Sequence, residues 1–126
     1  MGFPDRIERS INVAHPPAKV WEAITTAEGL GTWFGHKATI DLRIERIEPP
    51  RVFGYTWGIS GLPADDPRRT YVEFTLEPVA EGTRLTVVES GFAQLPDDSY
   101  PGAYGGNVEG WRTELGELVE YLDARA

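Results

Sequence analysis

The fold is decided by TYVEFTLEPVAEGTRLTVVESGF, residues 70–92. Apolar and polar residues alternate over 70–77 and again over 84–88, on either side of Glu81-Gly82. A period of two is that of a β-strand with one buried face. A short glycine-containing link between two such runs is typical of a hairpin. The stretch therefore predicts two antiparallel strands joined by a turn.

Upstream of this hairpin, the sequence predicts further strands and two short helices. Alternation predicts strands over 7–14 and 52–57, and the stretch 38–47 is rich in β-forming residues although less regular. His15-Pro16-Pro17 ends the first strand and begins a helix, because proline cannot donate in a ladder but suits the first helical turn. A second short helix is expected to open at residue 26 or 27.

Downstream, the composition turns to Gly, Pro, Asp and Tyr over 91–106, which predicts a loop. Apolar residues at helical spacing from Val108 to Leu122 then predict one long C-terminal helix. The order of strand, two short helices, several antiparallel strands and long helix predicts an α+β fold with the helices packed on one face of the sheet.

Composition excludes several classes of function. The 126 residues favour a single domain over 1–126. A formal net charge of −8 has the wrong sign for nucleic-acid binding, and the absence of Cys excludes disulfides, thiolate metal sites and thiol nucleophiles. Neither a secretory leader nor an apolar run long enough to cross a bilayer is present, so we expect a cytoplasmic protein without membrane contact.

Four runs of sequence carry a resemblance to a known superfamily. They are IERSINVAHPPAKVWEAITTAEGLGTWFG (7–35), RIERIEPPRVFGYTW (43–57), the hairpin stretch quoted above and GWRTELGELVEYL (110–122). In this order they resemble the START-like, Bet v 1-like helix-grip superfamily (SRPBCC). Within it they are most similar to the branch of homologues of the activator of the 90-kDa heat shock protein ATPase.

The resemblance covers 7–122 and implies a particular architecture. A curved antiparallel sheet would wrap around the long C-terminal helix, with two short helices after the first strand and an apolar cavity between sheet and helix. One departure is that the branch usually has two strands joined by a Pro-Gly-Gly type turn where Arg43 here runs directly into Ile44. Either the sheet is shorter by a strand, or a segment is missing between Arg43 and Ile44, and we expect the second.

Large apolar side chains could line such a cavity, since ligand pockets are mostly apolar. The alternative is that they fill the core by packing against one another. The candidates lie on the second short helix, on the strand over 52–57 and on the long helix, and they are Trp33, Phe34, Phe53, Tyr55, Trp57, Val108, Trp111 and Leu115.

Glu89 is the most informative polar position. The period of two that turns Leu85 and Val87 inward also turns Glu89 inward, toward the long helix. A buried carboxylate needs a partner or a changed protonation state, so Glu89 could bind a ligand hydroxyl or amine, or act as an acid or base. The alternative, which we favour slightly, is a strand-end Glu bent toward water or paired with Arg112.

The remaining polar residues suggest no metal, cofactor or catalytic group. His15 and His36 are expected in loops, with no second ligand at metal-binding spacing. Neither Ser60 nor Ser90 has a His and an acid placed for a hydrolase triad. The acidic residues along the long helix, among them Glu114, Glu117, Glu120 and Asp123, are expected to be solvated.

The function favoured by these observations is binding of one small lipophilic or aromatic molecule, with Glu89 and Tyr55 setting its orientation. A co-chaperone-like interaction module, as the branch name suggests, ranks below it. An enzyme of cyclase, aromatase or hydrolase type is left open, because helix-grip cavities host such activities. A homodimer is also left open, since it would cover an unpaired strand edge.

Overall fold

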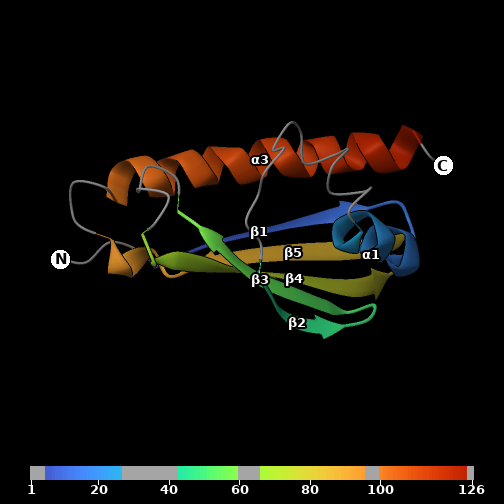
Figure 1. The fold of residues 1–126 in the computed structure, drawn as a ribbon. Helices are drawn as coiled ribbons and strands as arrows, with labels where there is room; N and C mark the ends of the chain where they lie inside the picture. Colours follow the sequence, from blue (N-terminus) through green and yellow to red (C-terminus); the bar gives the residue numbers. More distant parts are fainter. Residues whose placement is uncertain (1–4, 27–42, 60–65, 96–99, 125–126) are drawn as a thin grey trace.

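The computed structural model describes residues 5–26, 43–59, 66–95 and 100–124. Its elements, in chain order, are β1 (Arg6–Val13), α1 (Pro17–Thr25), β2 (Arg43–Glu48), β3 (Val52–Gly58), β4 (Arg69–Val79), β5 (Gly82–Ser90), the 3₁₀ helix η1 (Phe92–Gln94) and α3 (Tyr100–Ala124) (Figure 1). The α+β architecture is that predicted from the sequence. The second short helix, with Trp33, Phe34 and His36, lies outside the described residues.

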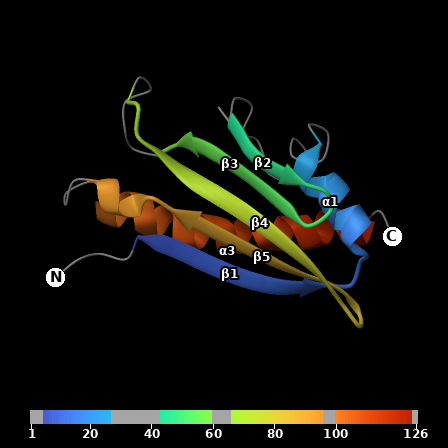
Figure 2. The same cartoon turned by 90° about the horizontal axis from the view of Figure 1, so that it is seen from below.

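The strands form one antiparallel sheet in the order β1-β5-β4-β3-β2. The expected hairpin is formed by β4 and β5, which pair from Tyr71 with Ser90 to Val79 with Gly82. Gly82 has a φ of 149° at this turn, and a Cβ there would lie 2.1 Å from the carbonyl oxygen of Val13. Only glycine meets both requirements without strain. Figure 2 shows the sheet in front of α3, with β1 and β2 at its two edges.

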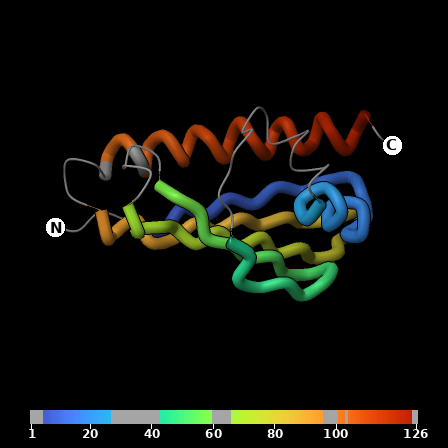
Figure 3. The backbone as a smooth tube through the Cα atoms, in the orientation of Figure 1, coloured from blue at the N-terminus to red at the C-terminus, as the bar shows by residue number. Residues whose placement is uncertain are grey.

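The long helix α3 runs along one face of the sheet (Figure 1). Its backbone comes close to β1, η1 and α1, and α1 also packs against β4 and β5. Figure 3 shows β1 at the side of the sheet nearest α3 and β2 at the side farthest from it. The helix therefore packs most closely on one side of the sheet. Large side chains must span the distance between α3 and the strands β3 and β4.

The loop expected over 91–106 is wrong over 100–106, because α3 begins at Tyr100. Glycines at 102, 105 and 106 each cost about 1 kcal/mol relative to Ala in a helix, which is why composition predicted a loop. Tertiary contacts override this preference. The Tyr104 ring packs edge-on against Phe92 at 5.3 Å, and its hydroxyl donates to the carbonyl of Arg6 at 3.2 Å.

The segment expected to be missing between Arg43 and Ile44 is not missing. β2 runs through both residues, which pair with the consecutive β3 residues Thr56 and Tyr55. Consecutive pairing leaves no room for an insertion at this point. The sheet formed by the described residues has five strands. Whether the sheet has a further strand stays a prediction, because residues 27–42 lie outside the described residues.

Candidate functional site

A row of side chains crosses the middle of the sheet on the face toward α3. Strand register places Ile44 opposite Tyr55, Tyr55 opposite Val72, Val72 opposite Glu89, and Glu89 opposite Ile7. Residues directly opposite each other in antiparallel strands point to the same face. All of the row except Ile44 is buried. The row therefore carries two polar groups, Tyr55 and Glu89, into the interior.

Glu89 is completely buried and accepts hydrogen bonds from four side chains. Its Oε2 accepts from Trp57 Nε1 at 2.8 Å, from Thr70 Oγ1 at 2.5 Å and from Asn107 Nδ2 at 3.0 Å. Its Oε1 accepts from Trp111 Nε1 at 2.8 Å and from Asn107 Nδ2 at 2.9 Å. The favoured alternative of a Glu bent toward water or paired with Arg112 is therefore wrong.

These partners define the charge at the centre of the site. Indole and amide N–H groups can only donate, and an ionised carboxylate is an acceptor with about four lone-pair sites, so the arrangement suits the ionised form of Glu89. All four partners, Trp57, Thr70, Asn107 and Trp111, are neutral. Among the described residues, the carboxyl group of Glu89 is thus held by neutral hydrogen-bond donors and not by a cation.

Tyr55 is the second polar group of the row, and its surroundings differ. Its side chain is fully buried, and within the described part of the chain its hydroxyl has no hydrogen-bond partner. Burial raises the pKa of this hydroxyl well above its ordinary value, and the carboxylates of Glu89 and Glu114 raise it further. The hydroxyl is therefore protonated at neutral pH and can both donate and accept.

Aromatic rings surround these two groups and connect the sheet to α3. The rings of Trp57 and Trp111 stack at 5.7 Å between centroids, and Trp57 meets Tyr55 edge-on at 5.4 Å. Phe74 packs edge-on against Trp111 at 5.7 Å and tilted against Tyr55 at 6.3 Å. Packing of this kind fills part of the space between the layers, as the core alternative anticipated. Trp57 remains only partly buried.

The structure brings most of the predicted site residues together. Tyr55, Trp57, Glu89 and Trp111 are in mutual contact or joined by hydrogen bonds, as described above. Phe53 packs beside Tyr55 at 5.7 Å, Leu115 is buried in the same core, and Val108 packs on its margin. Trp33 and Phe34 lie outside the described residues.

Sequence reasoning missed two partners of Glu89. Asn107 was missed because it lies between the loop predicted over 91–106 and the helix predicted from Val108, and Thr70 because a strand Thr carries no signal of its own. A usable signal existed, since Trp57 and Thr70 face the same side in neighbouring strands. Two acidic residues of α3 are also less solvated than expected, because Glu114 and Glu117 are partly buried. Asp123 is exposed, as expected, and it binds the buried His15 Nε2 at 2.8 Å.

A curved antiparallel sheet with a long C-terminal helix across one face defines the helix-grip fold of the SRPBCC superfamily. The family model for Activator of Hsp90 ATPase homolog 1-like protein matches residues 35–123, and the chain belongs to this family. No curated protein matches the chain.

Solved structures agree with this assignment. MLL2253 from Mesorhizobium loti is 28% identical with a TM-score of 0.76, and the match covers 96% of this chain and 98% of that one. DynU16, a protein of the dynemicin biosynthetic locus, is 25% identical with a TM-score of 0.75, covering 95% of this chain but 48% of its own. The Aha1 dimer from Colwellia psychrerythraea is 18% identical with a TM-score of 0.72, covering 93% and 95%. The last likeness concerns the fold alone.

Two further properties limit the chemistry of the described residues. None of their helices is long and apolar enough to cross a membrane. Nor do these residues contain a group of three or more His, Asp or Glu side chains that could hold a metal ion. The chemistry that the site offers is hydrogen bonding to a polar group beside Tyr55 and apolar contact with the aromatic rings.

Proposed function

We propose that this protein binds one small lipophilic molecule between its sheet and α3, with the polar end of the molecule at the Tyr55 hydroxyl. The observation that carries the proposal is the burial of this hydroxyl without a partner in the described residues. A buried polar group without a hydrogen bond costs about 1–3 kcal/mol. A ligand hydroxyl, carbonyl or amine placed beside Tyr55 would remove that cost.

The place of Tyr55 in the fold supports a ligand at this point. The backbone of α3 comes closest to the sheet at β1. Tyr55 lies on β3, which is on the other side of the sheet. Aromatic side chains of β3, β4 and α3 span the intervening distance, and their rings would offer apolar surface to the body of a ligand. Burial of such surface contributes about 25 cal/mol per Å². That DynU16 belongs to a biosynthetic locus agrees with a small-molecule role for the shared fold.

The charge of Glu89 sets the class of ligand. Its carboxylate is buried near Tyr55, and its four hydrogen-bonding partners are neutral. A ligand charge about 6 Å away would interact with it by roughly 3 kcal/mol at an effective dielectric constant of 20, which is about a hundredfold in affinity. A neutral or cationic head group is therefore favoured, and an anionic one is disfavoured.

A matched set of ligands tests this proposal. 1-Decanol, decylamine and decanoate share one alkyl chain and differ in the charge of the head group. We expect calorimetric titration at about 150 mM salt, where surface charges are largely screened, to give one site per chain. The expected affinity order is decylamine, then 1-decanol, then decanoate. Failure of all three to bind, or decanoate binding best, would contradict the proposal.

Two matched variants separate the site from the acidic surface. Glu89→Gln removes the buried charge, and Glu120→Gln removes a charge from an exposed position of α3. We expect the preference for decylamine over decanoate to collapse in the first variant and to persist in the second. Circular dichroism checks that each variant is folded. If Glu89→Gln does not fold, the affinity order of the three ligands for the wild type decides the test.

The chaperone-directed role is supported by the family name alone, and we rank it second. An enzymatic role ranks third, because the geometry described above favours no particular reaction. A cytoplasmic location stays a prediction.

A further inference from the structure

The edge strand β2 is exposed along its whole length. All six of its residues, RIERIE, are exposed, and its neighbour on one side is β3. Ile44 is 60% exposed and Ile47 is 54% exposed, and they are the large hydrophobic residues most accessible to solvent in the described chain. An exposed edge of this kind is a template for pairing with another strand.

A bulge in β2 sorts its side chains between the two faces of the sheet. Ile44 pairs with Tyr55 and Ile47 with Phe53, and the register shifts by one residue between Ile44 and Arg46. Because Tyr55 and Phe53 point to the face that carries α3, both isoleucines lie on that face. The bulge thus gathers two exposed apolar side chains on one face of the strand.

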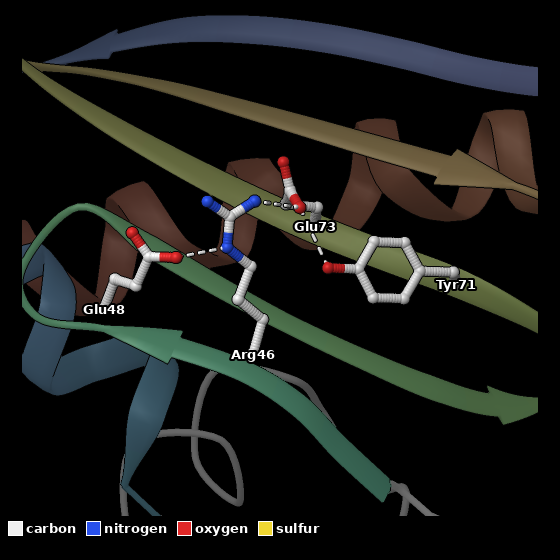
Figure 4. Close-up of polar contacts among 4 residues, drawn as sticks. All are labelled: Arg46, Glu48, Tyr71 and Glu73. Atoms are coloured by element: carbon white, nitrogen blue, oxygen red, sulfur yellow. Dashed lines mark hydrogen bonds and ion pairs between the residues drawn. The ribbon is translucent and has the colours of Figure 1, made fainter.

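Charged side chains of β2 gather on the opposite face. Arg46 binds Glu48 within the strand and Glu73 on β4 at 3.3 Å, and Tyr71 donates to Glu73 at 2.9 Å. Figure 4 shows these four residues in front of the sheet, with α3 behind it. Glu45 acts electrostatically on Tyr71, which places it near the same group.

The sequence of β2 is complementary to itself when it is reversed. Placing RIERIE antiparallel to a second copy sets Arg43 opposite Glu48, Ile44 opposite Ile47 and Glu45 opposite Arg46. Each charged residue then faces the opposite charge, and each isoleucine faces an isoleucine on the same face. Both strands contain the extra residue of the bulge, so the pairing register between the two copies is kept along the whole strand.

We propose that β2 is a self-association surface, on which the β2 strands of two copies pair antiparallel around a two-fold axis between Glu45 and Arg46. The two sheets then join edge to edge, and the contact is isologous and closed. Main-chain hydrogen bonds provide the attraction, as in other cases of strand addition. The charges that set this register also repel strands of unmatched sequence, which limits the assembly to a second copy.

The size of the contact sets its strength. Stable specific interfaces bury about 1,200–2,000 Å² in total, and a pair of six-residue edge strands supplies less than that. We therefore expect a weak, concentration-dependent dimer. Its dissociation constant should fall in the micromolar range, on the order of 10–100 µM.

Sedimentation equilibrium of the full chain, from about 5 to about 500 µM so as to bracket that constant, tests the proposal. We expect a monomer–dimer equilibrium in the wild type. Arg43→Glu places like charges opposite each other at both ends of the contact and should weaken the dimer at least about tenfold. The double variant Arg43→Glu with Glu48→Arg restores opposite charges across the axis and should recover most of the wild-type affinity.

Glu8→Arg serves as the matched control, because Glu8 is an exposed residue of β1, the other edge of the sheet. It should leave the dimer unchanged. The proposal is overturned by a wild type that stays monomeric at the highest concentration, by failure of the double variant to recover, or by an equal effect of Glu8→Arg. Species that grow beyond a dimer would also overturn it, because they indicate pairing of β1 with β2.

Discussion

Glu89 connects the two layers of the protein through one carboxylate. Trp57 and Thr70 donate to it from the sheet, and Asn107 and Trp111 donate to it from α3. Because each hydrogen bond to a charged group is stronger than a neutral one, these contacts fix the rotamers of both indoles. The carboxylate therefore joins sheet and helix by hydrogen bonds at the place where the aromatic rings join them by packing.

Replacing Glu89 by Gln should destabilise the fold. The Gln amide is neutral, and its NH₂ group can only donate. It would therefore face the N–H and O–H donors around position 89 without being able to accept their hydrogen bonds. We expect a loss of roughly 3 kcal/mol in the free energy of unfolding, the size reported for hydrogen bonds to buried charged groups. Urea unfolding measures this loss, provided that the dependence of the unfolding free energy on urea concentration has the same slope in variant and wild type. Glu120→Gln, on the exposed side of α3, should change stability little, and a loss under about 1 kcal/mol at Glu89 would contradict the interpretation.

Single residues show how far the sequence could predict this site. The period of two turned Glu89 inward, although the sequence analysis slightly favoured a side chain bent toward water or paired with Arg112. Tyr55, Trp57 and Trp111 were expected to line the space between sheet and helix. The identity of the partners could not be predicted, because alternation gives the face of a residue but not which residues of another element reach it. Asn107 in particular depends on a helix that local composition argues against.

At the scale of elements, the first two turns of α3 are held by contacts with the rest of the protein. Three glycines weaken this end of the helix, whereas Tyr104 anchors it on Phe92 and on the carbonyl of Arg6. A Cβ added at Gly105 would meet nothing within 4 Å. The glycines here therefore meet no steric requirement that the structure shows.

Gly105→Ala should stabilise the protein by about 1 kcal/mol, because alanine loses less backbone entropy in a helix. Gly82→Ala is the matched contrast. Its Cβ would lie 2.1 Å from the carbonyl oxygen of Val13 at a φ of 149°, so it should destabilise. Thermal unfolding of the two variants measures both changes. A fall in stability for Gly105→Ala would show that the glycine is required by its surroundings.

Elements with strong periodicity were predicted well, and those with weak periodicity were not. The β4–β5 hairpin and the second half of α3 follow from alternation and helical spacing. The start of α3 and the continuity of β2 did not, because each depends on pairing or packing with distant residues. Tertiary contacts decided both, against the local signal.

At the scale of the whole molecule, α3 is fastened to the rest of the protein at both ends. Tyr104 binds the backbone of β1 near its first turns, and Asp123 binds the buried His15 at its last turn. The middle of the helix carries Trp111 over the sheet, where aromatic rings bridge the layers.

Tyr55→Phe is the measurement that tests the central claim most directly. It removes a hydroxyl that is buried without a partner in the described residues, and it leaves the ring in place. We predict that the free energy of unfolding rises by about 1–2 kcal/mol while the affinity for 1-decanol falls about fivefold to tenfold. A variant that is less stable, or that binds 1-decanol as tightly as the wild type, would contradict the assignment of this hydroxyl to a ligand.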